Sequence, residues 1–154
     1  MKRKYFAMLL TLLLAVAMMI PTQALAADGT KKAINEKLGV PIVVYGANLT
    51  AEQKETVKNA LEITSSSAVE EITVSGQDLV KYIKDGNPNA RMFSSAKITQ
   101  RNEGEGLVID IVTPSNITQI TSEVYASAML TAGIENALVE VAAPNPVTGH
   151  SALV

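Results

Sequence analysis

Hydrophobic and polar positions follow two different periods along this chain, and together they predict an α/β fold. A nearly unbroken apolar and β-branched run from Val40 to Tyr45, ending at Gly46, is typical of a buried strand. Residues 51–62 place apolar side chains three and four positions apart, which predicts a helix with one buried face. A strand over residues 71–74 follows, so this part of the chain predicts a βαβ unit.

Polar residues mark where the helices should begin. Thr50 and Gln53 have the spacing of a capping box, in which a hydroxyl and an amide satisfy free backbone donors. Ser75 and Asp78 repeat this spacing before a short helix, which the turn Asp85-Gly86-Asn87-Pro88 should end.

The pattern then changes to period two. Residues 91–100 and 107–113 alternate in this way, and Glu103-Gly104-Glu105-Gly106 lies between them, so we predict a β-hairpin. A third helix should begin at Thr121 and end at Gly133, which suits a left-handed C-cap. Its predicted buried stripe consists of Val124, Tyr125, Ala128 and Met129.

Residues 138–142 predict the last strand, and 144–150 a rigid turn. After that turn, Ser151–Val154 resembles the opening of another helix. Since an apolar, uncapped end is unusual, we expect the natural reading frame to continue past Val154. The whole pattern predicts one α/β domain over residues 38–154, with α+β possible: a mixed sheet of βαβ and β-hairpin units packed by three to four helices.

The first 26 residues have the order of a secretory signal peptide. Basic residues 2–4 precede a fourteen-residue apolar run over 7–20. A helix of fourteen residues is about 21 Å long, whereas the hydrocarbon core of a bilayer is about 30 Å thick. We therefore expect an export signal that is removed and leaves no stable membrane anchor.

Small residues indicate where this signal is cut. Ala24 and Ala26 occupy the positions that a signal peptidase reads, and Ala27 would begin the mature chain. A flexible mature N-terminus over residues 27–37 should follow. The expected location is therefore extracellular or associated with the cell wall.

Composition then excludes several classes of function. Three of the thirteen basic residues lie in the signal and all fifteen acidic residues lie beyond it, so the mature chain has a net charge of −5. This charge disfavours nucleic acids and anionic membrane surfaces as partners. The chain has no cysteine, so it has no disulfide, thiolate nucleophile or cysteine-based zinc site. We predict no catalytic residue, metal site or cofactor.

The most promising functional feature is the loop over residues 144–151, which two prolines stiffen. Its polar residues Thr148, His150 and Ser151 follow the end of a strand, where α/β folds tend to bind ligands. The alternative is a connection selected for its shape alone. A Ser151 nucleophile with His150 as its base is disfavoured, because adjacent turn residues rarely point at each other and no acid orients the imidazole.

The chain also resembles a known family. The strings "SSAKIT", "GLVIDIVTPSNITQIT" and "YASAMLTAGIENALVEVAAPNPVTGHSAL", with the earlier "VVYGANLTAEQKETV", are similar to the YpuA-like family, domain of unknown function 1002. The resemblance covers residues 38–154. It implies an exported Gram-positive envelope or extracellular protein with no established activity, and members that continue beyond the point where this chain stops.

Two classes of function remain open at this stage. The first is a non-catalytic binding or interaction module for an unknown envelope component, from which a structural wall protein cannot be distinguished. The second is an envelope hydrolase whose catalytic residues lie partly in a missing C-terminal region.

Overall fold

The computed structural model describes residues 39–154. The predicted signal peptide over 1–26, its cleavage residues Ala24, Ala26 and Ala27, and the predicted flexible segment over 27–37 lie outside the described residues. Across residues 39–154, no helix combines the length and the apolar character that crossing a bilayer requires.

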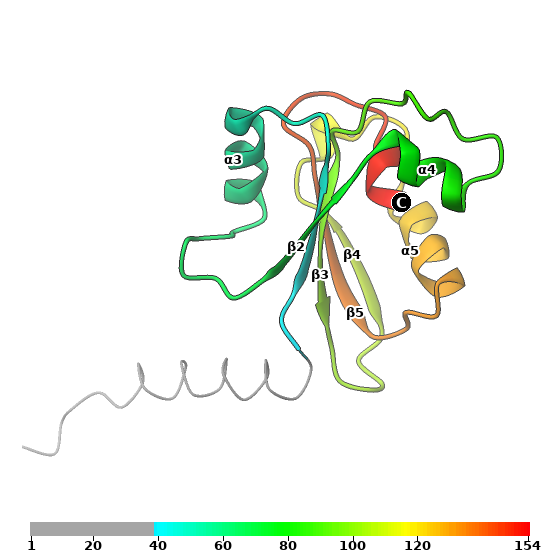
Figure 1. Ribbon diagram of the computed structural model, residues 1–154. Helices are drawn as coiled ribbons and strands as arrows, with labels where there is room; N and C mark the ends of the chain where they lie inside the picture. The colour runs from blue at the N-terminus through cyan, green and yellow to red at the C-terminus, as the bar shows by residue number, and fades with distance from the viewer. Residues whose placement is uncertain (1–38) are drawn as a thin grey trace, which may run out of the picture. The chain divides into compact units, whose positions relative to one another are not determined.

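Five strands form one mixed sheet in the order β2-β1-β3-β5-β4 (Figure 1). The strands are β1 (Ile42–Gly46), β2 (Glu70–Val74), β3 (Ser95–Gln100), β4 (Leu107–Ile111) and β5 (Ala137–Ala142). β1 pairs with β2 and β4 with β5 in parallel, whereas the β1–β3 and β3–β5 pairs are antiparallel. The predicted α/β class with a mixed sheet is confirmed.

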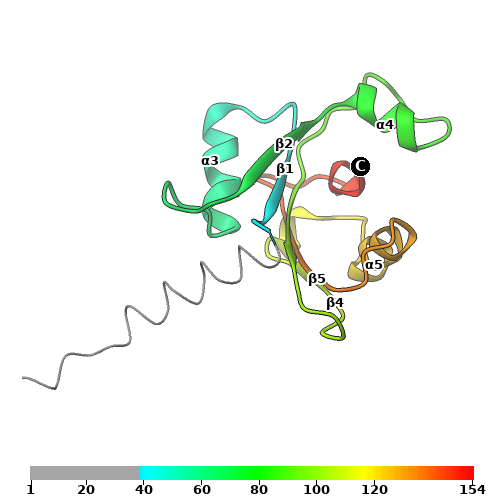
Figure 2. The same cartoon turned by 60° about the horizontal axis from the view of Figure 1, so that its bottom comes forward.

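Three α-helices accompany the sheet within the described residues: α3 (Ala51–Ala60), α4 (Gly76–Tyr82) and α5 (Ser122–Thr131). Two short 3₁₀ turns, η1 (Pro114–Asn116) and η2 (His150–Leu153), complete the fold. Figures 1 and 2 show α3 on one face of the sheet, with α4, α5 and the C-terminal turn η2 on the other side.

The predicted βαβ unit is β1–α3–β2. Its helix begins at the predicted capping box, where the Thr50 N–H donates to Gln53 Oε1 at 3.0 Å and the Gln53 N–H donates to Thr50 Oγ1 at 3.2 Å. Val57 of α3 and Leu61, which follows the helix, are completely buried. They pack with Val43 and Tyr45 of β1 and form the core on this face of the sheet.

The predicted β-hairpin is wrong in its pairing. Both of its strands exist, but the first begins at Ser95 rather than Arg91. β5 lies between β3 and β4 and pairs with each of them. β5 is buried on both faces, with Val139 and Val141 in one core and Ala142 in the other, as is typical of a strand inside a sheet. The six residues 101–106 are long enough to join strands separated by two strand spacings, about 10 Å.

α5 also differs from the prediction in one residue. Tyr125 is buried and Met129 packs against the same core, as the predicted stripe requires. Val124 is 43% exposed, because it lies about 100° around the helix from Tyr125 and α5 buries only one narrow side. Gly133 adopts the left-handed conformation predicted after the helix, with φ of 81°.

Candidate functional site

Three segments far apart in the sequence surround a pocket of about 330 Å³. Leu79 of α4 and Ile83 just after it form one side, the segment before β3 contributes residues 90–93, and the loop after β5 contributes residues 147–151. The last segment contains the three candidate residues Thr148, His150 and Ser151. The predicted ligand loop therefore forms one wall of a largely apolar pocket.

Ser151 is a buried residue whose hydroxyl joins η2 to the start of β3. Its Oγ accepts the N–H of Phe93 at 3.1 Å and that of Ser94 at 2.8 Å, and it lies 2.5 Å from Ser94 Oγ. Ser94 Oγ in turn accepts the N–H of Ala152 at 3.0 Å. This serine pair fixes two walls of the pocket against each other, so the Ser151 hydroxyl has a structural role.

Thr148 and His150 are exposed at the pocket. The backbone carbonyl of Thr148 accepts the N–H groups of Gln119 and Ile120, both at 3.2 Å. Among the interactions of residues 39–154, none joins the side chain of His150 to that of Ser151. The structure thus brings all three candidates to one pocket but forms no nucleophile–base pair from them.

Gly149 gives the loop its shape. Its φ of 100° lies in the left-handed region, and an added Cβ would come 2.6 Å from the Tyr125 hydroxyl and 2.8 Å from Ile117 Cγ2. Instead, that Tyr125 hydroxyl donates to the Gly149 carbonyl at 2.7 Å. Burial raises the pKa of Tyr125 to about 12, so the phenol keeps its proton to a higher pH than an ordinary tyrosine does.

Residues 90–93 form the wall that the sequence analysis missed. Asn48 holds this wall, since its N–H donates to the Met92 carbonyl at 3.0 Å and its Oδ1 accepts the Met92 N–H at 2.7 Å. The Arg91 guanidinium carbon lies 5.8 Å from the centre of the Phe93 ring. One signal was available: Phe93 is the only phenylalanine beyond the predicted signal peptide.

α4 leaves apolar side chains exposed beside the pocket. Val80 is 40% exposed, Ile83 39% and Tyr82 75%. Its first turn is well formed, because the Ser75 N–H donates to Asp78 Oδ2 at 2.9 Å, as the predicted capping box requires. Ile83 therefore both lines the pocket and belongs to this exposed apolar group.

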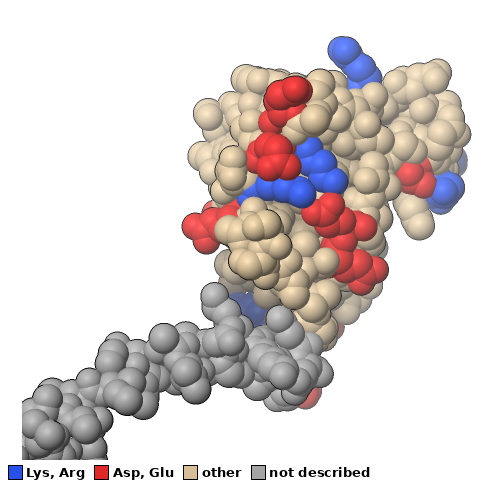
Figure 3. Space-filling model, turned by 60° about the vertical axis from the view of Figure 1, so that its left-hand side comes forward, with Lys and Arg blue, Asp and Glu red and all other residues tan. Residues whose placement is uncertain are grey.

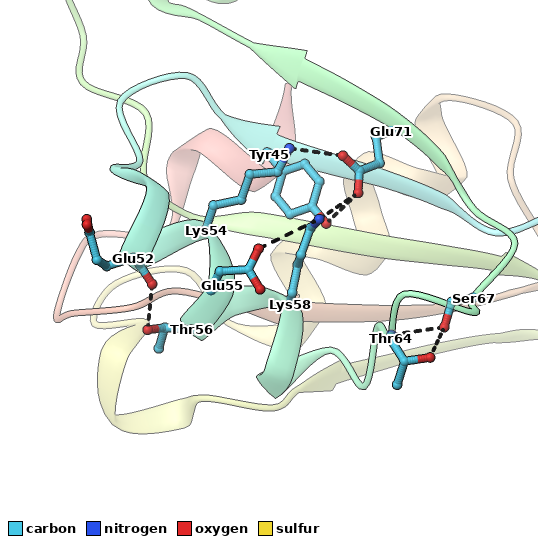
Figure 4. A network of polar contacts seen from close by, with 9 residues as sticks. All are labelled: Tyr45, Glu52, Lys54, Glu55, Thr56, Lys58, Thr64, Ser67 and Glu71. Carbon is cyan, nitrogen blue, oxygen red and sulfur yellow. Dashed lines mark hydrogen bonds and ion pairs between the residues drawn. The ribbon is translucent and has the colours of Figure 1, made fainter.

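A second polar cluster lies on the opposite face of the sheet, between α3 and β2 (Figure 4). Glu71 Oε2 lies 2.9 Å from Lys54 Nζ, its Oε1 lies 3.3 Å from Lys58 Nζ, and the Tyr45 hydroxyl donates to it at 3.4 Å. The hydrogen bond from Lys54 lowers the pKa of Glu71, and burial raises that of Tyr45. Because these side chains form ion pairs and hydrogen bonds with one another, the cluster has the structural role of joining α3 to β2.

The charges on that face are mixed in sign. Figure 3 shows acidic and basic side chains next to one another on this side of the molecule. Within residues 39–154, no three or more His, Asp or Glu side chains are grouped so that they could hold a metal ion.

A larger hollow of about 680 Å³ lies at the other end of the sheet. Val40, Ile42, Ile98 and residues 133–137 contribute to its lining. Gly39, where the described part of the chain begins, also lines it, and none of the predicted site residues does. We therefore take the smaller pocket as the candidate site.

The fold and the pocket define a class: an α/β domain with a mixed five-stranded sheet and an apolar pocket beside a glycine-shaped loop. A family model described as "Protein of unknown function (DUF1002)" matches residues 45–154. The chain is 32% identical over 157 residues to "Uncharacterized protein YpuA" of Bacillus subtilis (strain 168), covering 99% of this chain and 49% of the relative. No solved structure matches.

The chain belongs to the DUF1002 family, as the resemblance of residues 38–154 indicated. It spans about half the length of the Bacillus relative that it matches. The function of this family is unknown.

Proposed function

We propose that the protein is exported and acts at the cell envelope or outside the cell as a non-catalytic binding module. Its pocket would receive an apolar side chain of a peptide partner. The order of residues 1–26 supports export. The observation that carries the binding role is the meeting of α4, residues 90–93 and residues 147–151 around one apolar pocket.

A peptide suits this pocket better than a compact small molecule. The pocket volume of about 330 Å³ is at the low end for ligand sites and accommodates little more than one large side chain. The exposed apolar residues Val80 and Tyr82 lie on α4, and Ile83 follows its last residue. They offer contact area to the rest of a longer ligand.

The test is a titration of the mature protein with N-acetylated tripeptides ending in leucine or phenylalanine, each with a free and an amidated C-terminus. We expect amide resonances of residues 79–83, 90–93 and 147–151 to shift in ¹H–¹⁵N spectra. Ile83→Ser should weaken binding, whereas Val124→Ser, which removes a similarly exposed apolar side chain from α5, should not.

Two results would refute this proposal. One is that no peptide shifts the pocket resonances at millimolar concentration. The other is turnover of peptidoglycan or peptide substrates by the purified protein, which would favour the envelope hydrolase instead.

A further inference from the structure

The ionisable side chains that line the pocket are all basic, although the chain as a whole is acidic. The only ionisable side chains among its lining residues are Arg91 and His150. No acidic residue lines it, while the chain beyond the predicted signal peptide carries five more acidic than basic residues. The charge of the lining residues therefore favours an anion, although the chain as a whole is acidic.

Arg91 is placed to act on a ligand in the pocket. Its guanidinium lies near the Phe93 ring, which lines the pocket, and no ion pair involving Arg91 is found within residues 39–154. By comparison, Lys54, Lys58, Lys81 and Lys97 each lie within 4.0 Å of a carboxylate oxygen. The Arg91 guanidinium is thus the basic group of the pocket that lacks a carboxylate partner in the described structure.

We infer that the partner is the C-terminal end of a polypeptide, with the last apolar side chain in the pocket and the free carboxylate beside Arg91 and His150. This inference rests on the proposed function and specifies its ligand. A C-terminal residue combines an apolar side chain and a carboxylate on one Cα, which matches a small apolar pocket with basic groups among its walls.

The experiment compares acetyl-Ala-Ala-Leu with a free C-terminus and the same peptide as its C-terminal amide. We expect the acid to bind about three- to fivefold more tightly at low salt, since Arg91 is exposed and screened by water. The preference should shrink as ionic strength rises. Arg91→Gln should abolish it and Arg91→Lys should retain most of it, whereas Lys84→Gln, outside the pocket lining, should leave it unchanged.

The outcomes show which of the two proposals fails. Equal binding of acid and amide would overturn the carboxylate inference and leave the binding module standing. Tight binding of acetyl-Glu-Ala-Leu amide would overturn the assignment to a C-terminus, because an internal carboxylate would then suffice. If neither peptide binds to the pocket, both the inference and the proposed function are wrong.

Discussion

The hydroxyl of Ser151 makes a specific contribution to stability that its neighbour Thr148 does not. Ser151→Ala would leave the buried N–H of Ser94 without its 2.8 Å acceptor. We expect a loss of about 1–3 kcal/mol, because a buried donor then lacks a partner. Thr148→Ala, at an exposed position, should change stability by less than about 0.5 kcal/mol. Denaturant midpoints of the two variants measure the difference, and equal values would contradict the structural role of Ser151.

Tyr125 should make the folded protein less stable as the pH rises into the alkaline range. Its pKa is raised to about 12 in the folded protein, whereas an unfolded tyrosine ionises near pH 10. The folded state therefore holds this proton more tightly, so the stabilisation is complete below about pH 10 and is lost between about pH 10 and 12. Burial raises the pKa of Tyr45 as well, so each tyrosine contributes part of the loss.

Tyr125→Phe tests this contribution. The variant should be less stable at neutral pH, because the Gly149 carbonyl loses its 2.7 Å donor. Its stability should nevertheless fall less steeply above pH 10 than that of the unmodified protein. Free energies of unfolding measured from pH 8 to 11.5 give the pH dependence of stability for each protein. Parallel curves would show that Tyr125 has the same pKa in the folded and unfolded states.

At the scale of elements, local signals were predicted well and long-range pairing was not. The Thr50–Gln53 capping box and the left-handed Gly133 depend on neighbours within a few residues, so the sequence alone was sufficient for them. The position of β5 depends instead on how the five strands pair with one another. This is a comparison among all five strands, and no turn signal reveals it.

The pocket likewise has one wall that local sequence signals predicted and one wall that depends on a long-range contact. Thr148, His150 and Ser151 were predicted together from a stiff loop after a strand, and the structure places all three at one pocket, because a loop of this kind is visible in sequence. The wall over residues 90–93 was missed, since its position depends on the contact of Met92 with Asn48, 44 residues away.

Because the chain has no cysteine, the order of the strands can be tested with pairs of introduced cysteines. Thr99, Leu138 and Val108 lie in one row across β3, β5 and β4. Thr99→Cys with Leu138→Cys should form a disulfide on mild oxidation, since paired strands bring Cβ atoms within about 5.5 Å. Thr99→Cys with Val108→Cys should not, since two strand spacings, about 10 Å, separate them. Mass spectrometry after thiol alkylation distinguishes the cases, and the opposite result would restore the hairpin.

At the scale of the whole molecule, two cores on opposite faces of one sheet stabilise a chain that has no disulfides. Val43, Val57 and Leu61 lie in the core beneath α3, and Val139 and Val141 lie in the core beneath α5. Packing of this kind stabilises a domain in any redox environment. The fold is therefore compatible with export but does not require it, and export must be tested on the N-terminal residues themselves.

Export predicts a specific mature N-terminus. When the full chain is expressed in a Gram-positive host, the processed protein should begin at Ala27 and appear in the medium or the wall fraction. Ala26→Leu should block cleavage, because the peptidase needs a small residue there, and the uncut protein should remain with the membrane. Ala17→Leu, within the apolar run, is the matched control and should be processed normally. N-terminal sequencing and intact mass measure the outcome, and an uncut chain with Met1 in the soluble cytosolic fraction would refute export and the envelope role that depends on it.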